Sequence, residues 1–192
     1  MPALACQLTP YDQLEALPEG LTGEILNGQL HTQPRPSGRH GRASVLLDRA
    51  LGRSYDDGDA GPGGWWILIE PEVHFIRDTE VAVPDLAGWR RQRMPQIPDG
   101  HRFEVVPDWV CEILSPSTES KDRNIKMPLY AHYGVPHAWL LDPRQRRLEA
   151  YALETQGQQP SGWRLLLEAG GTECVQAPPF SELALELDAL WV

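Results

Sequence analysis

The spacing of apolar residues changes from segment to segment along this chain, and these changes predict short strands alternating with helices. Between residues 40 and 53 apolar residues recur every three or four positions, as in an amphipathic helix. Thr9 before Pro10 is typical of the start of another helix, and Asn27-Gly28 between two short apolar runs favours a hairpin turn. The first half is therefore expected to contain helices at 10–20 and 40–53, a hairpin of 23–26 with 29–32, and strands at 65–69, 72–76 and 80–87.

The segment from Asp108 to Leu114 is apolar on both faces of the strand that it is expected to form. Side chains alternate between the two faces of a strand, and between residues 109 and 114 only Glu112 is charged. Strands of this kind lie in the covered centre of a parallel or mixed sheet. The elements expected after it are a helix at 124–133 with Lys126 at its start, a buried strand at 137–141, an antiparallel pair at 147–153 and 163–167, and a last strand at 184–187.

The order of these elements predicts an α/β (α+β) fold. Strand, helix and strand around Glu112 and Trp139 indicate a central mixed sheet flanked by helices, with an N-terminal hairpin and C-terminal antiparallel strands added to it. The chain has 192 residues, of which 41% are hydrophobic and 23% charged, and this length allows one full core. Residues 1–192 are therefore expected to form a single domain.

Glu112 is the first candidate for chemistry, because its carboxylate lies inside an apolar run. An ionised carboxylate without a partner in such surroundings would cost several kcal/mol or shift its pKa. Three arrangements avoid this cost: a lysine partner, a bound metal ion, or protonation of the acid. Each of them would make the position a site.

A second carboxylate, Asp85, is expected at or just past the end of the preceding strand, where Pro84 lacks the N–H that a strand ladder needs. Two carboxylates on neighbouring strands can hold a divalent ion, and Lys126 could orient or help deprotonate an attacking water. The alternative is chance, since the chain has 27 acidic residues. Lys126 could then form an exposed ion pair with Asp122, and replacing it would hardly change stability.

Several motifs along the chain form a pattern that matches a known family. They are Gly23–Gly28, His40, Pro84–Leu86, Val110–Thr118, Asp122, Lys126, Tyr130 and Gly134–Pro143. Together they resemble the Uma-type restriction endonuclease family of the PD-(D/E)XK nuclease-like superfamily. The resemblance covers roughly residues 10 to 190, nearly the whole chain, and implies a restriction-endonuclease-like core.

The resemblance also implies a metal-dependent endonuclease that hydrolyses phosphodiester bonds of nucleic acid, with DNA as the expected substrate. Asp85 and Glu112 would bind Mg²⁺, for which Mn²⁺ could substitute, and Lys126 would be the catalytic lysine. The superfamily's plain pattern has the lysine two residues after the glutamate, where this chain has Leu114, so Lys126 would replace it from the following helix. Supporting roles are expected for Glu24, His40, Asp122 and Tyr130.

The net charge of −10 is unfavourable for a nucleic-acid-binding protein, because such proteins gain much of their affinity by neutralising phosphates. Two arginine clusters are nevertheless expected to flank the site and to contact nucleic acid, although solvated loop arginines are an equal alternative. They consist of Arg35, Arg39 and Arg42, and of Arg90, Arg91 and Arg93.

The cysteines and the N-terminus indicate a cytoplasmic protein. Cys6, Cys111 and Cys174 lack the spacing of a disulfide framework or a zinc site, and residues 1–6 lack the features of a secretion signal. No membrane partner is expected. A homodimer or higher homo-oligomer is expected, because nucleases of the resembling superfamily often pair so that two sites address two strands.

Three functions remain open on the sequence alone. The first is the metal-dependent endonuclease. The second is a non-catalytic nucleic-acid-binding or protein-interaction module that retains the nuclease fold, which the acidic charge and the displaced lysine favour. The third is an enzyme of another class on the same scaffold, because one fold can host many chemistries.

Overall fold

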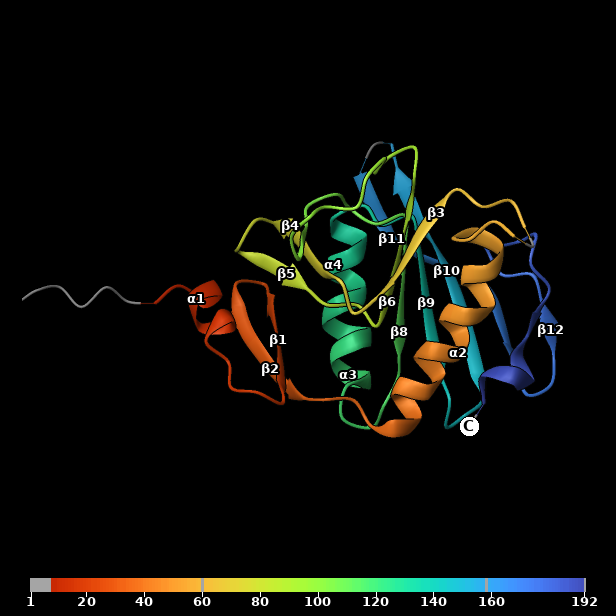
Figure 1. The fold of residues 1–192 in the computed structure, drawn as a ribbon, viewed down its shortest axis with the longest axis horizontal. Coiled ribbons are helices and arrows are strands. Elements are labelled where there is room, and N and C mark those ends of the chain that lie inside the picture. Colours follow the sequence, from red (N-terminus) through yellow and green to blue (C-terminus); the bar gives the residue numbers. More distant parts are fainter. Residues whose placement is uncertain (1–7, 60, 158, 192) are drawn as a thin grey trace, which may run out of the picture.

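The computed structural model describes residues 8–59, 61–157 and 159–191. Two β-sheets pack against each other with helices beside them (Figure 1). The elements are α1 (Pro10–Glu15), β1 (Leu21–Leu26), β2 (Gln29–Pro34), α2 (Gly38–Tyr55), β3 (Trp65–Ile69), β4 (Glu72–Ile76), β5 (Glu80–Ala82), β6 (Leu86–Arg90), β7 (Arg102–Phe103), β8 (Trp109–Ile113), α3 (Glu119–Lys121), a π-turn (Asp122–Lys126), α4 (Met127–His132), β9 (His137–Asp142), β10 (Arg147–Gln156), β11 (Gln159–Gly170), β12 (Cys174–Val175), β13 (Leu185–Glu186) and the 3₁₀ turn Leu187–Leu190.

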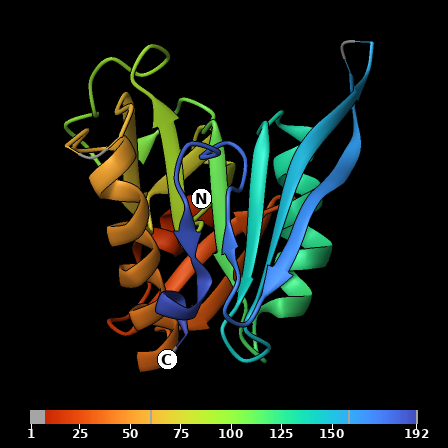
Figure 2. The same cartoon turned by 90° about the vertical axis from the view of Figure 1, so that its right-hand side faces the viewer.

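The larger sheet has six strands in the order β11-β10-β9-β8-β6-β3. The pair β8–β9 is parallel and the other neighbouring pairs are antiparallel, so the sheet is mixed, as the sequence predicts. In Figure 2, β10 and β11 extend beyond the end of β9. Both strands are longer than expected, and beyond β9 they pair only with each other. The short strand β12 was not predicted.

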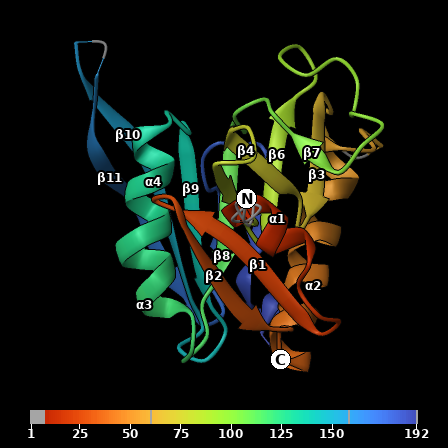
Figure 3. The same cartoon turned by 90° about the vertical axis from the view of Figure 1, so that its left-hand side faces the viewer.

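Two hydrophobic cores lie on the two faces of this sheet. On one face, Trp109 and Ile113 pack against α2 and the C-terminal segment with β12 and β13. On the other face, Val110 and Leu114 pack against α4 and the smaller sheet, whose order is β2-β1-β5-β4-β7. Figure 3 shows the hairpin β1–β2 in front of β8, beside the column formed by α3 and α4. The predicted double covering of β8 is confirmed, and Glu112 points to the face of the smaller sheet.

Local signals placed the first elements correctly. Thr9 and Asp12 form a reciprocal capping box at the start of α1. Asn27 and Gly28 have φ angles of 53° and 72°, which a two-residue hairpin turn of this kind requires. α1 ends at Glu15, before the expected position near Gly20, and α2 is two residues longer than the predicted helix at each end.

Two predicted boundaries near the expected site were wrong. Residues 80–87 do not form one strand: β5 and β6 belong to different sheets, and Val83–Asp85 connects them. Pro84 cannot donate to a ladder, so the break falls there, and Asp85 precedes β6 instead of ending a strand. The helical segment begins at Glu119 and not near Asn124, so Lys126 lies in its middle, in the π-turn.

Cys111 is buried and Cys174 is exposed, and both are free thiols, whereas Cys6 and the rest of the N-terminal segment lie outside the described residues. Among the described helices, none has the length and apolarity needed to cross a membrane.

Candidate active site

The candidate site lies where β8 ends and β6 begins. Leu86 of β6 pairs with Cys111 of β8, which brings Asp85, just before β6, level with Glu112. Asp85 therefore lies in the linker just before β6, beside Glu112 in the neighbouring strand β8. Around them the structure gathers the start of α2, strand β1 and the π-turn.

Asp85 is fixed by two contacts. Its Oδ1 atom lies 2.8 Å from Nε2 of His40, and its Oδ2 atom accepts the N–H of Ile113 at 2.6 Å. Ser37 caps α2 by accepting the N–H of His40, which holds this histidine in the first turn. Burial pushes the pKa of His40 down, but the hydrogen bond and the charge of Asp85 outweigh burial, and the pKa is raised.

Glu112 is fully enclosed, with 2% of its surface exposed. Its carboxylate accepts from Nζ of Lys126 at 2.9 Å and from the hydroxyl of Tyr130 at 2.5 Å. Of the three arrangements expected for this acid, the structure has the lysine partner. Burial raises the pKa of Glu112 well above its usual range, Lys126 counteracts this, and the nearby acids Asp122 and Asp85 add to it.

Lys126 has three acceptors for its three N–H bonds. They are Glu112, Oε1 of Glu24 at 2.8 Å and the carbonyl oxygen of Val83 at 3.0 Å. Burial alone would lower the pKa of Lys126, but Glu112 and Glu24 raise it well above the usual value, so the ammonium persists. Lys126 and Asp122 are each only 2% exposed, so the alternative of an exposed ion pair between them was wrong.

Glu24 links strand β1 to the helical segment. Its carboxylate accepts the N–H of Val83 at 2.9 Å and ion-pairs with Lys126 at 2.8 Å and Lys121 at 2.5 Å. Burial raises its pKa, but the two lysines outweigh burial and hold the pKa of Glu24 at about 2. Nζ of Lys121 also donates to the side-chain oxygen of Gln33 on β2.

Sequence reasoning missed Lys121 and Gln33. For Lys121 a signal existed: of the 17 basic residues only Lys121 and Lys126 are lysines, and both contact Glu24. Gln33 carries no comparable signal, because its position depends on the hairpin register that pairs it with Thr22.

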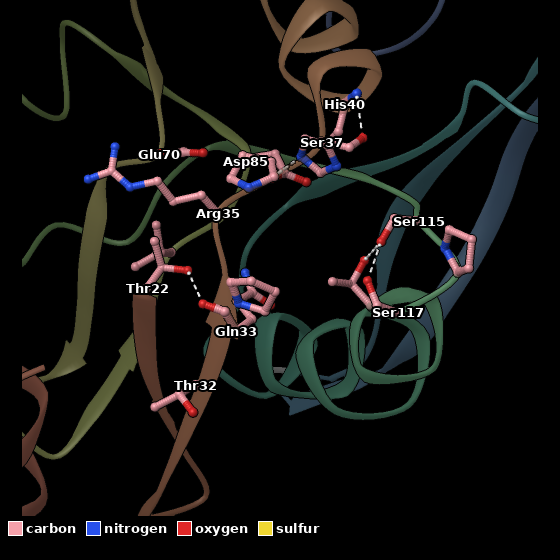
Figure 4. Close-up of a pocket in the computed structure, with 15 residues that line it drawn as sticks. Thr22, Thr32, Gln33, Arg35, Ser37, His40, Glu70, Asp85, Ser115 and Ser117 are labelled. Atoms are coloured by element: carbon pink, nitrogen blue, oxygen red, sulfur yellow. Dashed lines mark hydrogen bonds and ion pairs between the residues drawn. The ribbon is translucent and has the colours of Figure 1, made fainter. Parts of the chain in front are cut away.

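A cavity of about 410 Å³ opens beside Asp85 and His40 (Figure 4). The hairpin β1–β2 forms one wall, the start of α2 another, and the turn from Ser115 to Thr118 faces the hairpin. Asp122 is buried near Asp85, and burial, together with the charge of Asp85, raises its pKa although Lys126 acts in the opposite direction. The supporting residues expected from the sequence, Glu24, His40, Asp122 and Tyr130, thus all lie around the two acids.

The expectation that both arginine clusters flank the site was wrong for the second cluster. Arg90 pairs with Trp65 at the end of β6 opposite to Leu86, so Arg90, Arg91 and Arg93 lie a full strand length from Asp85. Arg91 pairs with Asp56, Arg93 with Asp108, and Arg90 lies over the ring of Trp65. In the first cluster, Arg35 lines the cavity.

Across residues 8–59, 61–157 and 159–191, no three or more His, Cys, Asp or Glu side chains are grouped as a ready metal cage.

The family model named Uma2, putative restriction endonuclease, matches residues 8–188. The chain belongs to the Uma2 family. Membership confirms the resemblance expected from the sequence, and it supports a nuclease-like function.

Two other proteins are similar to this chain. An uncharacterized protein of Synechocystis sp., slr1290, is 29% identical over 118 residues, which cover 62% of this chain and 58% of that protein. A crystal structure described as a putative nuclease from Anabaena variabilis matches with a TM-score of 0.69 and 22% identity, over 96% of this chain and 97% of the other. At this identity the likeness establishes the nuclease-like fold.

Proposed function

We propose that this protein is a metal-dependent DNA endonuclease whose site is formed by Asp85, Glu112 and Lys126. The observation that carries the proposal is their convergence: Asp85, just before β6, and Glu112, in the adjacent strand β8, meet a buried lysine that contacts Glu112. The expected homodimer and cytoplasmic location stay predictions.

The residues present fit a hydrated Mg²⁺ ion. Mg²⁺ prefers carboxylate oxygens and is usually held by one or two carboxylates plus water and substrate phosphate, so it needs no cage of three protein ligands. Four acids, Glu24, Asp85, Glu112 and Asp122, lie around two lysines and one histidine, so oxygen ligands of the kind that Mg²⁺ prefers are concentrated here. Asp85 and Glu112 would hold the ion, which when bound neutralises phosphate charge and activates water.

The other side chains position these acids. His40 orients Asp85, and Tyr130 orients Glu112. Lys126 supplies a fixed positive charge behind the acids and is anchored by Glu24. Because its pKa is raised, Lys126 keeps its proton at neutral pH, and its proposed role is electrostatic stabilisation and not removal of a proton from water.

A second candidate is a binding module that retains the fold without turnover. The observation in its favour is the closed network around Glu112, in which Lys126 and Tyr130 engage both carboxylate oxygens and 2% of the residue is exposed. A protein of this kind would bind nucleic acid or a protein partner equally well with and without a divalent ion.

The test is cleavage of plasmid and single-stranded DNA with Mg²⁺ or Mn²⁺ by the wild type, Asp85→Asn and Glu112→Gln. We expect both variants to lose on the order of 10²- to 10³-fold in rate, and EDTA to abolish cleavage. Asp99→Asn, an exposed acid outside the site, is the matched control and should cleave like the wild type. Equal cleavage by Asp85→Asn would assign the activity elsewhere, and no cleavage of any substrate would favour the binding module.

A further inference from the structure

We infer that the cavity beside Asp85 accepts one nucleotide of a single DNA strand, so that the substrate is single-stranded or locally unpaired DNA and not continuous duplex. This inference rests on the proposed function and adds the form of the substrate. Three features carry it: the depth of the acids, the lining of the cavity and the distribution of charge.

Of the two proposed metal-binding acids, Asp85 lines the cavity, whereas Glu112 is enclosed and does not line it. Glu112 and Lys126 are each 2% exposed, and the side chain of Asp85 is 16% exposed. Of the proposed site only Asp85 and its partner His40 line the cavity, so a phosphate has to enter it to reach Asp85.

The walls leave room for one nucleotide and not for a duplex. The volume of about 410 Å³ is that of a small-ligand pocket, and segments from five parts of the chain surround it: the hairpin, the start of α2, the β3–β4 turn at Glu70, the linker with Asp85 and the turn at Ser115 (Figure 4). In a duplex each nucleotide is stacked and paired, and enzymes that act inside a pocket have to extrude it or use a single strand. A flexible strand avoids that cost.

The lining suits a nucleotide. Pro34, Pro36 and Pro116 provide apolar surface of the kind that contacts a base in such pockets. Hydroxyl groups that can bind base edges or sugar come from both walls, at Thr22, Thr32, Ser37, Ser115, Ser117 and Thr118. Arg35 adds a positive charge that a phosphate can contact, and the lining also includes the acid Glu70.

The charge distribution does not suit a duplex. A duplex presents one charge per roughly 1.7 Å, and proteins that bind it neutralise many phosphates. Here the net charge is −10, and Arg90, Arg91 and Arg93 lie at the far end of β6. Arg35 lines the cavity, and Arg39 and Arg42 are exposed on the first turns of α2. Among the described residues these three arginines have no ion-pair partner. Three arginines can neutralise only a few phosphates.

The first test measures binding by fluorescence anisotropy in Ca²⁺, with one sequence presented as a single strand, a blunt duplex and a duplex with a central unpaired bulge. We expect the duplex to bind at least about tenfold more weakly than the single strand, because a nucleotide must be unpaired to enter, and the bulge to restore affinity. Arg35→Gln should weaken single-strand binding, while Arg49→Gln, an exposed arginine on α2 away from the cavity, should not.

The second test is cleavage of the same three DNAs in Mg²⁺, and together the two tests separate this inference from the proposed function. Preferred binding of the single strand without cleavage would leave the inference standing and overturn the proposed function. If the duplex is bound and cleaved as well as the single strand is, the proposed function is supported and the inference is overturned. Absence of binding to all three DNAs would overturn the inference as well.

Discussion

Replacing Lys126 with methionine should destabilise the protein strongly, contrary to the small effect that the sequence predicts. The side chain is 2% exposed, and its ammonium is bound by Glu112, Glu24 and the carbonyl of Val83. Methionine fills a similar volume but leaves two carboxylates without their shared cation. Breaking a buried pair by removing one partner costs about 3–5 kcal/mol, a large part of the roughly 5–15 kcal/mol that stabilises a typical domain.

The assay is urea denaturation followed by the fluorescence of the seven tryptophans, at neutral pH and at successively lower pH. In Lys126→Met the folded state is expected to hold a proton on Glu112 that the unfolded state releases above about pH 4.3. A group whose pKa is higher in the folded state than in the unfolded state stabilises the fold fully below its unfolded pKa. This stabilisation is lost as the pH rises through the folded pKa. The difference in the free energy of unfolding between the wild type and Lys126→Met should therefore be largest at neutral pH and shrink as the pH falls.

The double variant Lys126→Met, Glu112→Gln is the control, because it removes the buried charge together with its partner. Its loss of stability should be smaller than the sum of the two single losses, since the two side chains are in contact. Additive losses, or a loss for Lys126→Met below about 1 kcal/mol, which is the range of exposed ion pairs, would refute the reasoning.

Three further predictions concern polar contacts, two at the site and one between the helical segment and β10. Tyr130→Phe removes a hydroxyl donor from a buried carboxylate and should lower the free energy of unfolding by about 1.5–3 kcal/mol in urea titrations; an unchanged midpoint would contradict the contact. Lys121→Met should raise the pKa of Glu24 from about 2. The variant should therefore be less stable than the wild type in thermal unfolding at pH 7, and this difference should vanish as the pH falls toward about 2. A difference that does not depend on pH would argue against the role of Lys121. Two hydrogen bonds from Arg123, each 2.8 Å, lower the pKa of Glu149 despite burial, so Glu149→Gln should lose less stability than the wild type as the pH falls below about 4.3, and parallel pH curves would exclude this linkage.

The parts of the fold that depend on local chemistry could be predicted from the sequence. The period of apolar residues identified β8 as a strand covered on both sides, and Asn27-Gly28 identified the hairpin. The break after β5 was missed, because alternating residues on either side of Pro84 look the same whether or not the chain changes sheet. The early start of the helical segment was missed too, since Glu119–Lys121 has no capping hydrogen bond from a side chain.

The site was predictable as a set of residues more than as a network. The apolar run around Glu112 and the family motifs singled out Asp85, Glu112 and Lys126, and their meeting is what the structure adds. Contacts between distant segments, such as the pairing of Lys121 with Glu24, follow from packing that no local window contains. The placement of Arg90 likewise depended on the strand register, which sets the end of β6 at which it lies.

The bond from Glu24 to the helical segment has a consequence for synthesis of the chain. Lys121 follows Glu24 by 97 residues. At about 5–20 residues per second, the hairpin leaves the ribosome roughly 5 to 20 seconds before the lysine that pairs with it. During that interval Glu24 has neither of its cations and must stay hydrated, so β1 cannot bury this face. A nascent chain therefore completes the acidic cluster only after the helical segment has emerged, and in fragments that end before residue 121 the face of β1 that carries Glu24 should stay exposed to water.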